Sequence, residues 1–347
     1  MKAGFHSLTE MAAELERQNA VKADYVVDTR EMTMLNGTEL HLPNGIGEQS
    51  VLPLAHGQIA SRLKIPKRYY DRLLADHPQL LDLNVNGLFQ SEPERRMVRT
   101  LDGRARAFLS DRYRRRDNFE LAQAVFPVLK QIPDAQVLSC NLTDTRMYIK
   151  VVSPRLQADV KVGDTVQAGV SIENSEVGLG ALVVRPLIFR LICLNGMVSD
   201  AATRHYHVGK QVDADENYEV YSDETLRLDD QAFFAKVGDT VQAAVTEARF
   251  QEIVASMRET TETAPMKNPI EGVKVLANRY SLTEGEEQGI LTHLISEGDL
   301  SLYGALNAVT RASQDVEDYD RASEMEKLGG TMLTMAASDW REVATAA

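Results

Sequence analysis

The chain has 347 residues, of which 44% are hydrophobic and 26% charged, and its net charge is −13. This composition is typical of a water-soluble globular protein, and the length suffices for two domains. It contains no apolar run of the length that a membrane span needs, and two cysteines are too few for a disulfide framework or a zinc ribbon. The N-terminus lacks the pattern of a secretory signal, so we expect a cytoplasmic protein with reduced, buried cysteines.

The first 90 residues contain several helix signals. Ser7 and Glu10 have the spacing of a capping box, in which a serine side chain and a later glutamate satisfy the first amides of a helix. Pro66 is typical of a first helical turn. The predicted helices span 7–18, 56–63 and 66–75, and the range 80–90 is expected to be another helix or a turn-rich connection.

Turn signals divide the β-prone residues of the same half. Two Asn-Gly pairs, at 36–37 and 44–45, interrupt the range 25–54, and an Asp-Gly pair stands at 102–103. Asn-Gly and Asp-Gly favour the two-residue turns that connect antiparallel strands. We therefore expect two or three short strands within 25–54 and a strand pair over 96–101 and 104–109.

That strand pair lies in an arginine block, residues 95–116, which holds nine arginines and two aspartates and carries a net charge of +7 in an acidic chain. Arginine suits phosphate because its planar guanidinium donates two parallel hydrogen bonds and keeps its charge. The block therefore predicts a polyanion ligand, nucleic acid first. Its arginines are Arg95, Arg96, Arg99, Arg104, Arg106, Arg112, Arg114, Arg115 and Arg116.

The pattern changes after the block. Asp117 or Asn118 is expected to cap a helix that runs toward Lys130. β-Branched or alternating runs at 137–141, 146–152, 166–174 and 181–194 then predict a four-stranded antiparallel meander. Within the last run, Pro186 favours an edge position or a break.

Beyond residue 228 the spacing is almost wholly helical. The predicted helices span 230–258, 273–280, 283–296, 302–312 and 319–328. The expected fold class is α+β, an antiparallel β-meander with flanking helices and a mostly helical C-terminal region. We assign 1–227 to an α+β domain and 228–347 to the helical region.

A ten-residue peptide occurs almost twice. KVGDTVQAGV at 161–170 and KVGDTVQAAV at 236–245 differ at one position, yet their flanks do not match. The first copy precedes strand-like residues and the second lies between helical runs. We therefore expect one peptide in two conformations, with context overriding intrinsic propensity.

The candidate ligand-binding residues form two sets. In the arginine block, Tyr113 and Phe108 are candidate stacking partners for bases, although the arginines have an alternative in pairing with this protein's own carboxylates. The second set surrounds Arg190, which lies in an apolar run and must be paired or face solvent at an edge. That set comprises Arg204, His205, His207 and Lys210.

Catalytic and metal-binding interpretations have less support. His205 and His207 share a face of a strand, but nothing fixes a third metal ligand at Asp213 or Asp215. Cys193 with a histidine base would be a nucleophile, yet its apolar neighbours favour a core thiol. We expect no metal, no cofactor and no enzymatic activity.

Four ordered segments carry a family resemblance. They are LSDRYRRRDN at 109–118, NSEVG at 174–178, RLICLNGM at 190–197 and RHYHVG at 204–209, followed by YGALNAVT at 303–310 and the range 319–330. Together they resemble the phage/plasmid-like protein family, domain of unknown function 932, over about 54–330. The resemblance implies a phage, prophage or plasmid setting and no particular activity. A looser likeness links the expected meander and basic strand pair to single-strand annealing recombination proteins.

The main hypothesis is a nucleic-acid-binding protein of a phage or plasmid. It would bind single-stranded DNA as a homo-oligomer in recombination or replication, because repeating the arginine face along a strand compensates for the acidic remainder. The alternative is a non-enzymatic factor of a mobile element that binds a host or replication protein. A third hypothesis, a hydrolase or nuclease using His205, His207 and Asp213, requires a bound metal.

Overall fold

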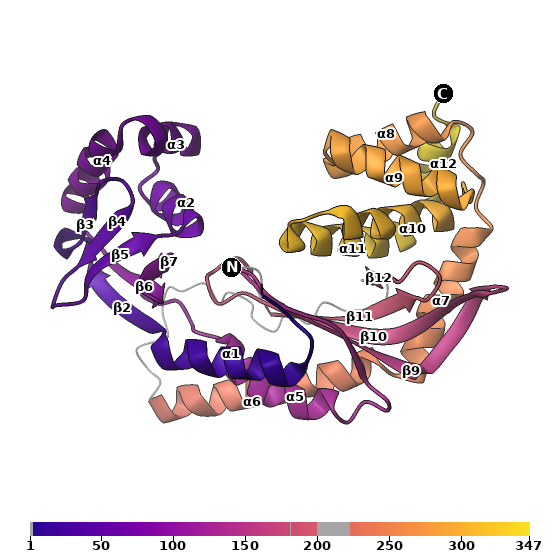
Figure 1. Cartoon of the computed structure of the whole chain (residues 1–347), viewed down its shortest axis with the longest axis horizontal. Helices are drawn as coiled ribbons and strands as arrows, with labels where there is room; N and C mark the ends of the chain where they lie inside the picture. Colours follow the sequence, from indigo (N-terminus) through magenta and orange to yellow (C-terminus); the bar gives the residue numbers. More distant parts are fainter. Residues whose placement is uncertain (1–2, 181, 200–222) are drawn as a thin grey trace.

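The computed structural model describes residues 3–180, 182–199 and 223–347, and these residues form two six-stranded sheets and a group of C-terminal helices (Figure 1). Sheet 1 is the smaller lobe at the left of the figure, and sheet 2 extends beneath the helical group. The fold class is α+β with a helical C-terminal region, as the sequence predicted.

Sheet 1 has the strand order β2-β6-β7-β5-β4-β3 and is antiparallel except where β5 pairs with β7. Its strands are β2 (Ala23–Asp28), β3 (Thr33–Leu35), β4 (Glu39–Leu42), β5 (Gly47–Val51), β6 (Arg95–Leu101) and β7 (Arg104–Ser110). The predicted turns are confirmed, since Asn36, Asn44 and Asp102 and the glycine after each adopt the left-handed conformation of a tight hairpin turn.

Helices cover one face of sheet 1 and enclose its core. They are α2 (Pro53–Arg62), α3 (Lys67–Asp76) and α4 (Pro78–Ser91), with a short 3-10 helix, η1 (Thr29–Glu31). Tyr70 of α3 and Phe89 of α4 are fully buried among the aliphatic side chains of the sheet. The predicted helices of this lobe are therefore confirmed, each within a few residues of its expected bounds, and the range 80–90 forms a helix rather than a turn-rich connection.

Sheet 2 is antiparallel throughout, in the order β1-β8-β9-β10-β11-β12. Its strands are β1 (Ala3–Phe5), β8 (Gln136–Leu142), β9 (Met147–Lys161), β10 (Asp164–Asn174), β11 (Val183–Arg190) and β12 (Asn195–Val198). The predicted meander forms β8 to β11, and β1 and β12 extend it at the two edges. Pro186 lies in β11, inside the sheet rather than at its edge, and its carbonyl accepts a hydrogen bond from the Ser199 amide just past β12. The missing N–H of Pro186 therefore removes no bond to β12, because pairing with β12 begins one residue later.

The two faces of sheet 2 are covered by different helices. On one face, α1 (Leu8–Val21), α5 (Asn118–Leu129) and α6 (Asp223–Ala244) bury an aliphatic core (Figure 1). The C-terminal helices cover the other side, where Val166, Ala168, Ile188 and Met197 enter their apolar core. Polar contacts lie there too, since Lys150 pairs with Glu326 of α11 (Tyr319–Leu333) at 2.5 Å. Ser7 caps α1 by accepting the Glu10 amide, as its spacing predicted.

The remaining helices form one core beside sheet 2. They are α7 (Glu247–Thr261), α8 (Pro269–Tyr280), α9 (Glu284–Glu297), α10 (Leu302–Ala312), η3 (Ser313–Asp315), α11 and α12 (Ala337–Thr345). The sequence did not predict α12, and the helix expected over 230–258 is divided at Thr246 into α6 and α7. The expected domain boundary at residue 228 falls inside α6, which packs on sheet 2 rather than with the C-terminal helices.

The near-duplicate peptide does adopt two conformations. The copy at 161–170 turns from β9 into β10, whereas the copy at 236–245 completes α6. Val162 at the hairpin tip is fully exposed, but its counterpart Val237 in the helix is fully buried. In the strand copy residues 166–170 are all buried, because both faces of β10 are covered. In the helical copy Val237 and Val241, four residues apart, lie on one buried side of α6.

Gly330 of α11 lies close to β12, so substituting it tests how tightly α11 packs on sheet 2. Gly330→Ala would place a Cβ 1.9 Å from the Val198 carbonyl oxygen of β12. Because α11 must then shift away from the strand, the free energy of unfolding in a urea titration should fall by about 1–3 kcal/mol. Gly87→Ala in α4 is the matched control, since its Cβ meets nothing within 4 Å, and it should stabilise the protein by about 1 kcal/mol. Equal effects of the two changes would contradict this packing.

Candidate functional site

The arginine block forms the junction between the two sheets. Arg99 of β6 is fully buried. Its Nε and Nη2 donate to the two carboxylate oxygens of Asp24 at 2.7 and 3.1 Å, and Nη2 also donates to Asp117 Oδ1 at 2.7 Å. Its Nη1 donates to the carbonyl oxygen of Glu176 at 2.6 Å. One guanidinium therefore joins β2 of sheet 1, the start of α5 and the segment that follows β10 of sheet 2.

A second buried pair strengthens the same junction. Arg106 of β7 contacts Glu176 at 2.6 Å, and the other carboxylate oxygen of Glu176 accepts the Asn118 amide at 3.0 Å. Asn174 at the end of β10 donates to the Asn118 side chain and to the Arg116 carbonyl. These contacts bring together the segments 109–118 and 174–178, whose motifs stand far apart in the sequence.

At this junction, ion pairing affects the pKa values of Asp117 and Arg99 more strongly than burial does. Burial raises the pKa of the Asp117 carboxyl, but Arg99 and Lys22 lower it further, so its pKa lies below the ordinary 3.8. The Lys22 ammonium lies 2.5 Å from Asp117. Burial likewise disfavours the charged Arg99, but Asp117 and Asp24 outweigh it and raise its pKa. Both groups are therefore ionised at neutral pH.

Two further arginines of the block connect to α6. Arg114 pairs with Asp229 at 2.6 Å and with Asp230 at 2.7 Å. The Arg116 guanidinium lies over the Phe233 ring, 3.6 Å from its centroid, a cation–π contact. These contacts help hold α6 beside the segment that enters α5.

Four residues that the sequence predicted to contact a ligand are instead packed or ion-paired within the protein. Arg99 and Arg106 are buried and ion-paired, so in this structure they do not face a ligand. The Tyr113 ring packs on a small apolar cluster, and burial raises its pKa. Phe108 is buried against Phe89. The sequence pattern located the charges, but the carboxylates that neutralise them come from distant segments.

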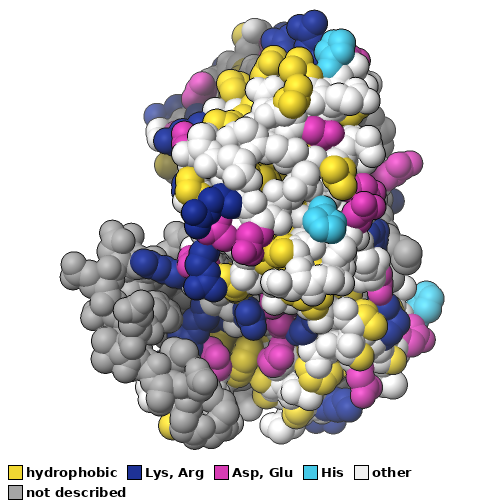
Figure 2. Space-filling model, turned by 90° about the vertical axis from the view of Figure 1, so that its left-hand side faces the viewer, with side chains coloured by type: hydrophobic (Ala, Val, Ile, Leu, Met, Phe, Trp, Pro, Cys, Tyr) yellow, Lys and Arg dark blue, Asp and Glu magenta, His cyan; other side chains and the backbone are white. Residues whose placement is uncertain are grey.

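Five arginines do gather at one end of the β6–β7 pair. Here β2 and β7 lie on either side of β6, with Arg95 opposite Asp28 and Arg96 opposite Ser110. Figure 2 shows this lobe from its outer side, with Lys and Arg side chains gathered among Asp and Glu side chains near the middle of the face. We name the group the arginine cluster: Arg30, Arg62, Arg95, Arg96 and Arg112.

Two carboxylates hold most of the arginine cluster in place. Asp28 accepts two hydrogen bonds from the Arg30 side chain, and Glu94 accepts from both Arg62 and Arg96. Arg30 and Arg62 lie outside the block, so counting charges along the sequence missed them. Their side chains are about half exposed, at 59% and 46%.

The other residues of the predicted site lie in several different places. Arg95 and Arg112 are exposed, and Arg104 lies half-buried at the opposite end of the hairpin. Arg115 is half-exposed and pairs with Asp24 at 3.0 Å. The other predicted positions, Arg204, His205, His207 and Lys210, lie outside the described residues, as do Asp213 and Asp215.

Arg190 is paired, as its apolar neighbours required. It donates to Asp164 at 2.8 Å and to Glu297 at 2.7 Å, and Tyr303 of α10 donates to the same aspartate. Burial, followed by Glu297, raises the pKa of the nearby Cys193 thiol. That thiol is therefore protonated at neutral pH, which opposes a nucleophilic role.

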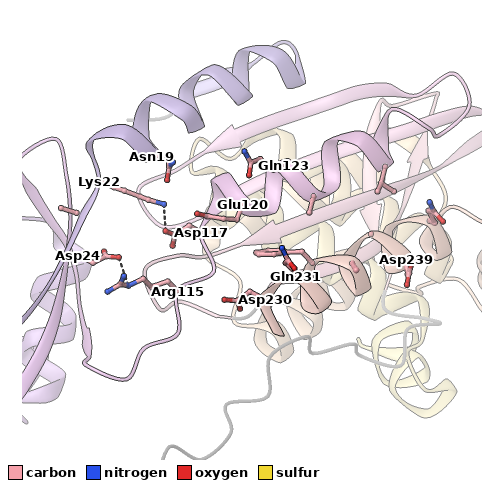
Figure 3. A pocket seen from close by; sticks show the side chains of 17 residues that line it. Asn19, Lys22, Asp24, Arg115, Asp117, Glu120, Gln123, Asp230, Gln231 and Asp239 are labelled. Carbon is pink, nitrogen blue, oxygen red and sulfur yellow. Dashed lines mark hydrogen bonds and ion pairs between the residues drawn. The ribbon is translucent and has the colours of Figure 1, made fainter. Parts of the chain in front are cut away.

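An open cleft of about 1280 Å³ lies between α1, α5 and α6 (Figure 3). Lys22 and Asp24 line the end nearest sheet 1, together with Arg115. Apolar side chains line its floor, and Gly238 lets α6 approach α5 closely, because its Cβ position lies 3.4 Å from Val128. Carboxylates and amides of α5 and α6 line the walls.

Among residues 3–180, 182–199 and 223–347, no group of three or more His, Cys, Asp or Glu side chains is arranged to hold a metal ion. Within the same ranges, no helix has the length and apolar character needed to cross a membrane.

Comparison with known proteins identifies a family. The family model described as domain of unknown function (DUF932) matches residues 130–338. The chain belongs to this family. The match covers sheet 2 from β8 onward and most of the C-terminal helices, so it begins after the arginine block and later than the expected residue 54. No curated protein and no solved structure matches the chain.

The charge pairing at the junction can be tested with Arg99→Met. The substitution leaves the buried Asp117 and the partly buried Asp24 without their shared guanidinium, so the free energy of unfolding at pH 7 should fall by about 3–5 kcal/mol. Urea titration measures this loss. Arg104→Met, which removes the same charge from the surface end of the hairpin, should cost no more than about 0.5 kcal/mol.

The pH dependence of stability distinguishes the loss of the ion pair in Arg99→Met from the loss of packing. In the wild type the lowered pKa of Asp117 contributes stability above the ordinary 3.8, and this contribution is lost as pH falls through the lower folded value. In Arg99→Met, Asp117 keeps only Lys22 as a cationic partner against its burial, so its pKa should be higher than in the wild type and protonation should relieve part of the destabilisation. The two proteins should therefore differ less in stability near pH 4 than at pH 7. A pH-independent difference would assign the loss to packing alone.

Proposed function

We propose that this DUF932 protein binds single-stranded nucleic acid through the arginine cluster, without acting as an enzyme. The observation that carries the proposal is the gathering of five arginines at one end of the β6–β7 pair, from three separate segments of the chain. Guanidinium groups recognise phosphate by charge and by paired hydrogen bonds.

The carboxylates in the cluster are compatible with phosphate binding. A guanidinium has five N–H donors, and Arg30 uses its Nε and one Nη2 hydrogen on the Asp28 side chain. Asp28 therefore orients Arg30 while other donors remain for a ligand. Exposed ion pairs contribute little stability, about 0–1 kcal/mol, so a phosphate group competes for them at small cost.

The compact shape of the cluster supports single strands over a duplex. A flexible strand can bend to bring successive phosphates onto a small patch, whereas duplex phosphates are held along a rigid helix. Recognition would then rest on phosphate and have little sequence preference, because of the predicted stacking residues Phe108 is buried and Tyr113 is partly buried against an apolar cluster.

The acidic remainder of the chain favours several copies on one strand. With a net charge of −13, a single copy gains little from long-range attraction to a polyanion. A homo-oligomer would repeat the cluster along the strand and add its contacts. A phage or plasmid role in recombination or replication is the setting we propose for this binding.

Binding can be measured by fluorescence anisotropy with a labelled oligothymidylate over a series of salt concentrations. Affinity should fall as salt rises, because each phosphate contact releases counterions. Arg95→Ala with Arg112→Ala should weaken binding at low salt and reduce the slope of log K against log salt by about 1.4, the value for two lost contacts to a single strand.

Arg341→Ala is the matched control, because it removes an exposed arginine from α12 and should leave both affinity and slope unchanged. A duplex of equal length should bind more weakly than the single strand. Absence of binding at low salt would contradict the proposal. An unchanged slope in the double variant would show that another surface binds the strand.

A further inference from the structure

The cleft between α1, α5 and α6 is acidic and has a floor of small and apolar side chains. Five carboxylates and two cations line it. Asp24 and Asp117 pair with cations of the junction, and Asp230 pairs with Arg114. Within the described residues, Glu120 of α5 and Asp239 of α6 have no cationic partner.

Those two carboxylates lie on the two helices that flank the floor (Figure 3). The floor itself is formed by Ala124, Val128, Phe234, Ala235 and Gly238. Ala124, Ala235 and Gly238 leave room for a bulky group beside Phe234, and the acidic walls favour a basic one. The cleft therefore fits a helix face that combines cations with an exposed aromatic side chain.

This chain carries such a face on α3. Lys67 and Arg68 stand in the first turn of α3, and Arg72 follows Arg68 by one turn on the same side. Tyr69, between them, is 44% exposed. The first turn contains no acidic residue, although a helix N-terminus favours negative charge and disfavours cations. Lys67 pairs with Asp71 one turn further along α3. Within the described residues no carboxylate pairs with Arg68 or Arg72, so contact with an acidic surface would give these two cations partners.

The two surfaces cannot meet within one molecule. In Figure 1, α3 lies at the top of the sheet 1 lobe, while α1, α5 and α6 lie along the bottom of the molecule. A contact between them must therefore join two copies. Because the two faces differ, the contact is heterologous and leaves one of each available, so it builds a ring or a filament.

We propose that α3 of one copy docks in the cleft of the next, with Tyr69 on the floor and Arg68 and Arg72 facing Glu120 and Asp239. This interface does not depend on nucleic-acid binding, although it would provide the repeated copies that such binding favours. A basic peptide of another protein is the rival occupant of the cleft.

Charge reversal on each side tests the interface. Light-scattering mass at about 50 µM protein and low salt should show assembly of the wild type and its loss as salt screens the charges. Glu120→Lys with Asp239→Lys should reduce the mass to that of the 38.6 kDa monomer, and so should Arg68→Glu with Arg72→Glu. The weakening of self-association should be at least tenfold in each case. Glu259→Lys with Glu284→Lys, the same charge change at exposed positions of α7 and α9, should leave the mass unchanged.

Mixing the two reversed variants decides the matter. Each variant repels its own kind, but a reversed cleft attracts a reversed α3, and the two native surfaces still attract one another. The mixture should therefore assemble, which misfolded variants would not do.

A monomeric wild type, or a mixture that stays monomeric, would overturn the proposal. So would an α3 variant that loses oligothymidylate binding without a change in mass, because α3 would then contact the strand. If the mixture assembles while no protein binds oligothymidylate, the interface stands and the proposed function fails.

Discussion

The fold depends on one buried guanidinium. Arg99 has no contact with solvent, so its charge requires anionic partners in fixed positions. Those partners are Asp24 of sheet 1 and Asp117 at the start of α5, and the Glu176 carbonyl provides a third acceptor. Removing any of them leaves a charge in a place where water cannot replace the lost partner. The relative placement of the two sheets is therefore set by an electrostatic requirement as well as by apolar packing.

Local structure was largely predictable because its causes are local. The Asn-Gly and Asp-Gly turns, the Ser7 cap and the alternation of β8 to β10 each arise from neighbouring residues. The short edge strands and α12 were missed, since few residues carry each signal. The division of the expected long helix at Thr246 was missed for the same reason.

The candidate site was less predictable, because charge pairing is decided in three dimensions. Along the sequence the arginine block has a large excess of positive charge, yet Arg99 and Arg106 take carboxylates from positions 24, 117 and 176. The same folding adds Arg30 and Arg62 to the surface that remains. One block therefore contains arginines that hold the fold together and arginines that the protein presents. Burial, and not charge count, distinguishes the two groups.

The repeated peptide has a consequence for how the chain folds. Val170 from the strand copy and Val237 and Val241 from the helical copy enter the same apolar core. Two peptides that differ at a single residue therefore pack against the same sheet, one as a strand and one as a helix. Neighbouring contacts separate them, since Arg116 on Phe233 and the ion pairs of Arg114 hold the second copy beside α5 as a helix. The arginines after β7 thus act against strand exchange between the two copies.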